Sequence, residues 1–127
     1  MKLQQSTPES RRQVARDAWA ALPHGGRQAL RLQVQCARGH HVAAVYDTPV
    51  GWAFVAPVRA HSHGSRDRID DPHGSHEIET WADLIAPTDD LLVDDSVPAW
   101  CDCGPRTLSR ADMLGWIAAG ERKAILD

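Results

Sequence analysis

Apolar residues near the N-terminus recur at helical spacing. Ser6 can cap a helix, Glu9 completes a capping box three residues later, and Pro8 is tolerated in the first turn. The apolar stripe consists of Val14, Ala15, Ala18, Trp19 and Leu22. We therefore predict a helix that ends at "PHGG" (23–26), within an N-terminal helical arm over residues 1–27. Its stripe either joins the core or docks on a partner.

After this segment the apolar residues recur at every second position. In "ALRLQVQC" the apolar positions alternate with polar ones, which predicts a strand with one buried face. "HVAAVYD" and "WAFVAPV" predict two further strands, and the connecting "TPVG" contains the proline and glycine of a turn. Together these segments predict an antiparallel meander over about 29–58.

The second half of the chain is less regular. Residues 59–76 show no periodicity and many turn-forming residues, so we expect a mobile loop there. In "IETWADLIA" the apolar residues fall on one side of a helix, which predicts a short helix. The members of that face are Ile78, Trp81, Leu84 and Ile85.

A final strand, "AWCDC", leads into a predicted C-terminal helix. Ser109 is its expected cap, Asp112 completes the box, and Gly120 ends it. Its apolar positions are Leu108, Met113, Leu114, Trp116 and Ile117. With the meander, these elements predict an α+β fold in which a small antiparallel sheet carries N-terminal and C-terminal helices.

Size and composition favour one cytoplasmic domain, residues 1–127. No stretch of about 18 apolar residues is present, so we expect no membrane span, and the first residues lack the apolar core of a signal peptide.

Charge is distributed unevenly along the chain. Residues 1–38 contain seven basic and two acidic side chains, whereas residues 39–105 contain three basic and twelve acidic ones. The acidic middle argues against a surface that envelops nucleic acid, although the basic N-terminal arm could touch phosphate.

The cysteines suggest a metal site. Cys101 and Cys103 are two residues apart at a strand end, so both thiols point to one side, and a disulfide between them would be strained. Cys36 closes the first strand, and His40 follows in the turn behind it. Three thiolates and one imidazole form a closed tetrahedral set typical of a single structural Zn²⁺. His41 is the main alternative to His40 as the fourth ligand, followed by a loop histidine such as His61 or His63.

Two other kinds of chemistry are less favoured. A second metal site could use the loop histidines, but solvated histidines in a charged loop lack preformed geometry. These histidines are His61, His63, His73 and His76. A nucleophilic Cys101 or Cys103 would need a positioned base, and Asp102 between them opposes thiolate formation. We therefore expect no catalytic residue.

Two segments resemble the short zinc-ribbon proteins of actinobacteria and their phages. These segments are "CARGHHVAAVYDTPVGW" and "CDCGPRTLSRADMLGWIAAGERK", and their specific parts are C-x2-G-H and C-x-C-G. The resemblance covers about 29–58 and 97–123. It implies a zinc-ribbon-like fold in which turns of two separate hairpins bind one zinc, and it implies no activity. The implied ligands are Cys36, His40, Cys101 and Cys103.

Three functions are compatible with such a site. The first is a zinc-stabilised module that binds another protein. The second is a nucleic-acid-binding regulator, whose contacts would be Arg11, Arg12, Arg16, Arg27, Arg31 and Arg38. The third is a zinc enzyme, which requires an open coordination position that a closed Cys₃His set lacks. We rank them in that order.

Overall fold

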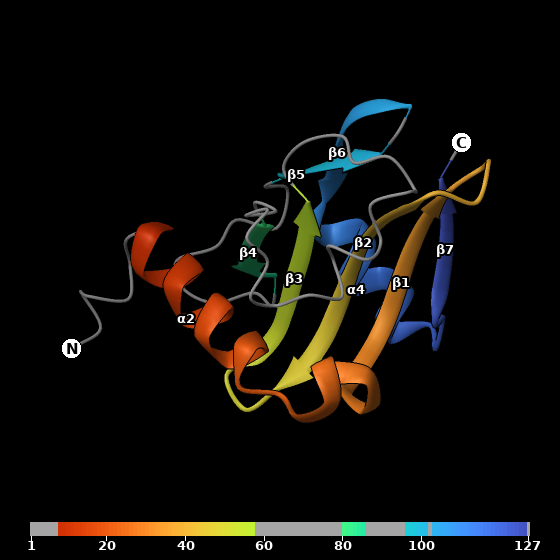
Figure 1. Ribbon diagram of the computed structural model, residues 1–127. Helices are drawn as coiled ribbons and strands as arrows, with labels where there is room; N and C mark the ends of the chain where they lie inside the picture. The colour runs from red at the N-terminus through yellow and green to blue at the C-terminus, as the bar shows by residue number, and fades with distance from the viewer. Residues whose placement is uncertain (1–7, 58–79, 86–95, 102, 127) are drawn as a thin grey trace.

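The computed structural model describes residues 8–57, 80–85, 96–101 and 103–126 and has a mixed α+β fold (Figure 1). A five-stranded sheet has the strand order β4-β3-β2-β1-β7, and a second sheet consists of β5 and β6. The elements are α2 (Pro8–Ala20), the 3-10 helix η1 (Pro23–Ala29), β1 (Leu30–Cys36), β2 (His41–Thr48), β3 (Gly51–Pro57), β4 (Thr80–Leu84), β5 (Ser96–Cys101), β6 (Gly104–Ser109), α4 (Arg110–Ala118) and β7 (Lys123–Leu126).

The predicted meander is confirmed, and it forms the middle of a larger sheet. Strands β1, β2 and β3 pair antiparallel in sequence order. At one edge β4 pairs antiparallel with β3, and at the other β7 pairs parallel with β1. The loop predicted at 59–76 lies outside the described residues.

The two faces of the five-stranded sheet are covered by different elements. Helix α2 packs on β3 and β4, where Ala15 contacts Ala53 and Ala82 in a small buried cluster. The main core lies on the opposite face, where β5, β6 and α4 pack; Figure 1 shows α4 behind the sheet. Its largest fully buried side chains include Phe54, Leu32, Ile85, Met113, Val34 and Val97.

The alternating pattern of β1 and β5 determines which way their last residues face. In β1 the buried positions are Leu32, Val34 and Cys36, and in β5 they are Val97, Ala99 and Cys101. All six belong to the main core cluster. Because side chains alternate across a strand, the same pattern that buries the apolar residues directs both terminal cysteines inward.

The short helix predicted over "IETWADLIA" is wrong, because residues Thr80–Leu84 form strand β4. A short apolar run fits both periods, and a helix of this length gains little from its own hydrogen bonds. Pairing with β3 instead provides hydrogen-bond partners for the backbone N–H and C=O groups on one side of the strand. The strand also places Asp83 inside the protein, at 1 % exposure.

The predicted C-terminal helix is confirmed as α4. The Ser109 side chain accepts a hydrogen bond from the backbone N–H of Asp112 at 3.1 Å, and Gly120 follows with φ 84°. Leu108, expected on this helix, lies instead in β6, which the sequence pattern did not predict. Strand β7 was also not predicted.

The predicted end of the first helix at "PHGG" is also correct. Helix α2 ends at Ala20, and His24, Gly25 and Gly26 then adopt left-handed conformations with φ of 56°, 69° and 81°. A Cβ at Gly26 would lie 2.9 Å from Cε2 of Tyr46, so a larger residue does not fit there without displacing that ring.

Arginines cover the outer side of the edge strand β4. The backbone carbonyls of alternate residues in this strand lie on one side. The Thr80 carbonyl accepts a hydrogen bond from the Arg16 side chain at 3.0 Å, and the Ala82 carbonyl accepts one from Arg12 at 3.3 Å. The Leu84 carbonyl accepts a hydrogen bond from the Arg110 side chain. The Arg12 guanidinium also lies 3.6 Å from the centroid of the Trp81 ring. These contacts close an edge that could otherwise pair with another strand.

Asp83 joins both helices to this edge. Its carboxylate accepts from Arg11 Nε of α2 at 2.9 Å and from an Arg110 terminal nitrogen of α4 at 3.0 Å. The backbone N–H of Leu84 donates to the same carboxylate at 2.8 Å. One buried carboxylate therefore binds and positions two arginines from opposite ends of the chain.

Replacing Asp83 with asparagine should destabilise the protein strongly. The substitution keeps the shape but leaves two arginines without their counter-charge, and breaking a buried ion pair costs about 3–5 kcal/mol. The free energy of unfolding in urea, measured on metal-loaded protein, tests this expectation. The matched control is Asp47→Asn on the exposed side of β2, for which we expect a change within about 0.5 kcal/mol. Equal stability of the two variants would contradict the role assigned to Asp83.

Candidate metal centre

The turn between β1 and β2 brings Cys36 and His40 together. The Gly39 N–H donates to the Cys36 carbonyl at 2.8 Å, and the Cys36 N–H donates to the His40 carbonyl at 2.9 Å. Gly39 has φ 86°, a conformation that glycine adopts without strain. The chain therefore reverses within four residues and places the imidazole beside the thiol that ends β1.

The second pair of ligands lies at the tight turn of the β5–β6 hairpin. Cys101 ends β5 and pairs with Gly104, the first residue of β6, so only two residues connect the strands. The backbone N–H of Cys103 donates to the Cys101 sulfur at 3.3 Å. In the other turn the N–H of Arg38 donates to the Cys36 sulfur at 3.4 Å. Each turn thus directs an N–H group at the sulfur two residues earlier.

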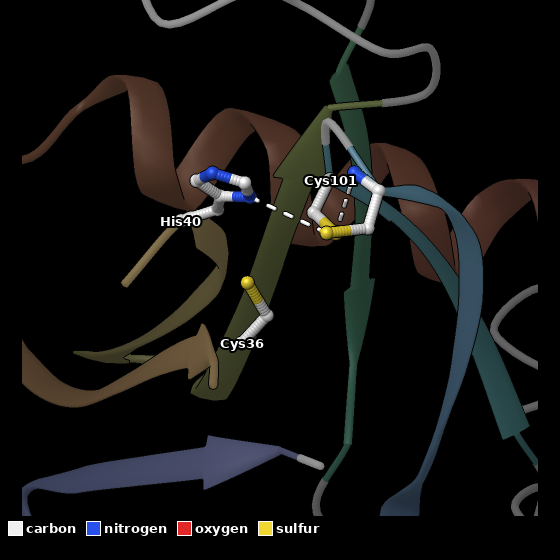
Figure 2. A group of neighbouring side chains, drawn as sticks. Cys36, His40 and Cys101 are labelled. Atoms are coloured by element: carbon white, nitrogen blue, oxygen red, sulfur yellow. Dashed lines mark hydrogen bonds between the residues drawn. The ribbon is translucent and has the colours of Figure 1, made fainter. Parts of the chain in front are cut away.

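The two turns meet, and four ligand atoms converge. The three cysteine sulfurs and one imidazole nitrogen of Cys36, His40, Cys101 and Cys103 all lie within 4.8 Å of one another. Figure 2 shows Cys36, His40 and Cys101 directed toward a common point. The Cys103 sulfur lies 3.5 Å from His40 Nδ1. Tetrahedral zinc with bond lengths of about 2.3 Å to sulfur and 2.0–2.1 Å to nitrogen needs a sulfur–nitrogen separation of ~3.6 Å. The Cys103–His40 separation already fits this value, and the four residues could hold one metal ion.

The thiols of the cluster shift one another's pKa values. Burial raises the pKa of the Cys36 thiol, but hydrogen bonds from the Arg38 and His40 backbone and from the neighbouring thiols outweigh it, so the pKa lies below its usual value. Removal of water raises the pKa of the Cys103 thiol, and Cys101 and Cys36 raise it further by hydrogen bonding and repulsion. Ionising all three sulfurs requires a positive charge among them, which a divalent metal supplies.

The structure brings together all four residues that the sequence predicted as ligands. His41, the main alternative to His40, is exposed at the start of β2 and is absent from the cluster. The loop histidines His61, His63, His73 and His76 lie outside the described residues. Sequence reasoning missed the backbone N–H groups of Arg38 and Cys103, because no side-chain pattern reports a hydrogen bond made by the main chain.

A hollow of about 350 Å³, here called the knuckle hollow, lies beside the centre. It is lined by Cys36, Ala37, Arg38, Cys103, Gly104, Pro105 and Arg106. Arg38 lies in the β1–β2 turn, and Arg106 lies in β6. A divalent ion with three thiolates and a neutral imidazole would have a net charge of about −1, and the two guanidinium groups partly offset such a charge.

No family model, curated protein or solved structure matches this chain. Among the described residues, no helix is both long and apolar enough to cross a membrane.

The two neighbouring histidines should respond differently to substitution. His40→Ala removes a predicted ligand, so the variant should lose zinc to a mild chelator at least about tenfold faster than the unmodified protein. His41→Ala, with its side chain outside the cluster, should release zinc at nearly the unmodified rate. Metal transfer to a chromogenic chelator measures both. Equal rates would point to a ligand in the 59–76 segment, and the reverse order would make His41 the ligand.

Proposed function

We propose that this protein is a small structural-zinc module with a zinc-ribbon-like centre, in which one Zn²⁺ fastens the β1–β2 turn to the β5–β6 hairpin. The observation that carries the proposal is the convergence of four ligand atoms, two from each turn, within 4.8 Å. Thiolates favour zinc over the hard cations magnesium and calcium. The turns of two separate hairpins around one ion are also what the resemblance to zinc-ribbon proteins implies.

The donor set supports a structural role over a catalytic one. Catalytic zinc keeps a position for water or substrate, whereas four protein donors fill a tetrahedral ion. The β5–β6 hairpin also presents a small apolar face, since its inward residues on β5 are Val97, Ala99 and Cys101. A two-stranded hairpin is marginal by itself, and binding energy at such a site becomes folding energy.

A protein partner fits the surface better than nucleic acid does. Four of the six arginines expected to contact nucleic acid are engaged inside the protein: Arg11, Arg12, Arg16 and Arg31. Arg31 donates to the carbonyls of Glu121 and Ile117. Of the large apolar side chains, Val50 and Ile125 are 46 % and 57 % exposed. We therefore propose a protein-binding, regulatory role in the reducing cytoplasm, where thiols remain available for metal. A submicromolar, salt-sensitive gel shift on arbitrary duplex DNA would contradict this choice of partner.

Protein purified without added metal should contain about one zinc per chain, because a closed structural site binds tightly. Elemental analysis measures the ratio. Removal of the zinc by a strong chelator should lower the unfolding temperature, and readdition should restore it. The control is Cys36→Ser, which removes a buried ligand and should abolish both the zinc content and the chelator effect. A folded protein with less than about a tenth of an equivalent of any metal would contradict the proposal.

A further inference from the structure

We propose that Cys103 is a site of oxidation by peroxides, and that its oxidation joins it to Cys36 by a disulfide and releases the zinc. This inference rests on the proposed zinc site and adds a chemical regulation of that site. It depends on three observations: how the three thiols differ in exposure, which of them share the knuckle hollow, and which pair can form an unstrained bond.

The three thiols differ sharply in access to solvent. Cys36 and Cys101 are 2 % and 3 % exposed, whereas Cys103 is exposed. Cys103 also lines the knuckle hollow, which is large enough for a small oxidant. With all three sulfurs held as thiolates by the proposed zinc, exposure decides which one reacts, so Cys103 is the first sulfur that a peroxide in solution reaches.

Cys36 is the better partner for an oxidised Cys103. Both residues line the knuckle hollow, and their sulfurs belong to the cluster within 4.8 Å. The Cys101 sulfur belongs to the same cluster, but Cys101 precedes Cys103 by only two residues in a tight hairpin turn. A disulfide favours Cα atoms roughly 5.5 Å apart and a torsion near 90°, which so short a loop strains. The bond between the two turns is therefore favoured over the bond within one turn.

The surroundings of the hollow assist the chemistry. Arg38 and Arg106 are among its lining residues, and positive charge near the hollow would stabilise the hydroxide that leaves when the peroxide O–O bond breaks. The Arg38 backbone N–H donates to the Cys36 sulfur, which favours the thiolate needed for the second step.

The reaction has two balanced steps. First, the Cys103 thiolate attacks one peroxide oxygen, the O–O bond breaks, and Cys103 becomes a sulfenic acid while hydroxide leaves and is protonated to water. Second, the Cys36 thiolate attacks the Cys103 sulfur, the S–S bond forms, and the S–O bond breaks to release a second hydroxide, also protonated. Two thiolates, one hydrogen peroxide and two protons give one disulfide and two waters; the thiolates lose the two electrons that reduce the peroxide.

Loss of two thiolate ligands frees the ion but does not free the hairpin. The disulfide would connect the end of β1 to the β5–β6 turn, the same two segments that zinc connects. Oxidation would therefore exchange a metal cross-link for a covalent one, and reduction in the presence of zinc would reverse the exchange.

The test begins with measured zinc content, so that absence of zinc counts against the proposed function and not against this inference. Zinc-loaded protein is treated with hydrogen peroxide while a chromogenic chelator reports metal release. We expect release to accompany a loss of about 2 Da per chain, a peptide map with a Cys36–Cys103 bond, and reversal by dithiothreitol with zinc. Release without a disulfide, or a map with only a Cys101–Cys103 bond, would overturn the proposal.

Two matched variants separate the exposed thiol from the buried one. Cys103→His and Cys101→His each replace one sulfur with a nitrogen ligand that zinc accepts. The Cys103→His variant should release zinc at least about tenfold more slowly than the unmodified protein, whereas Cys101→His should still form the Cys36–Cys103 bond. Equal release from both variants would overturn the assignment of Cys103. If either variant fails to retain zinc, the peptide map of the unmodified protein decides whether Cys103 bonds to Cys36 or to Cys101.

Discussion

The packing of the β5–β6 hairpin on the five-stranded sheet is the constraint on which the candidate site depends. Strands β1 and β5 each bury every second residue, and both belong to one core cluster. Since each strand ends in a cysteine at a buried position, closing the core also brings Cys36 and Cys101 together. The turns that follow add His40 and Cys103. The candidate metal centre is thus a direct consequence of the alternation that forms the core.

Two polar anchors hold the periphery of this core. On the edge strand β4, the Asp83 carboxylate binds arginines from α2 and α4, while neighbouring arginines cover the outward carbonyls. The second is the cysteine–histidine cluster, in which Cys36 at the end of β1 and the nearby His40 meet Cys101 and Cys103 of the β5–β6 hairpin. Strands β3 and β2 lie between β1 and β4 in the sheet. Both groups of residues bring together segments that are far apart in the sequence, and this limits the conformations open to a chain that has a modest apolar core. The α2 arginines that bond to β4 consequently serve the fold.

Local sequence patterns predicted the elements that are stabilised mainly by interactions between residues close together in the sequence. Period-two alternation predicted β1, two apolar segments joined by a proline- and glycine-containing turn predicted β2 and β3, and the Ser109 cap predicted α4. The glycine-containing turns behind Cys36 and Cys101 predicted the four clustered residues. Strand β4 was mistaken for a helix, because its apolar spacing is ambiguous and the long-range ion pair of Asp83 leaves no local trace. Strand β7 pairs with β1 through a contact some ninety positions away along the chain, which no local pattern encodes. The contacts of the α2 arginines with β4 leave no local trace for the same reason.

X-ray absorption at the zinc K-edge of the purified protein tests the central claim most directly, because it reports the donor atoms. A zinc ion joining the two turns predicts a first shell of three sulfurs at about 2.3 Å and one nitrogen at about 2.0–2.1 Å. A shell of oxygen and nitrogen alone, or one with fewer than three sulfurs in the reduced protein, would contradict the account.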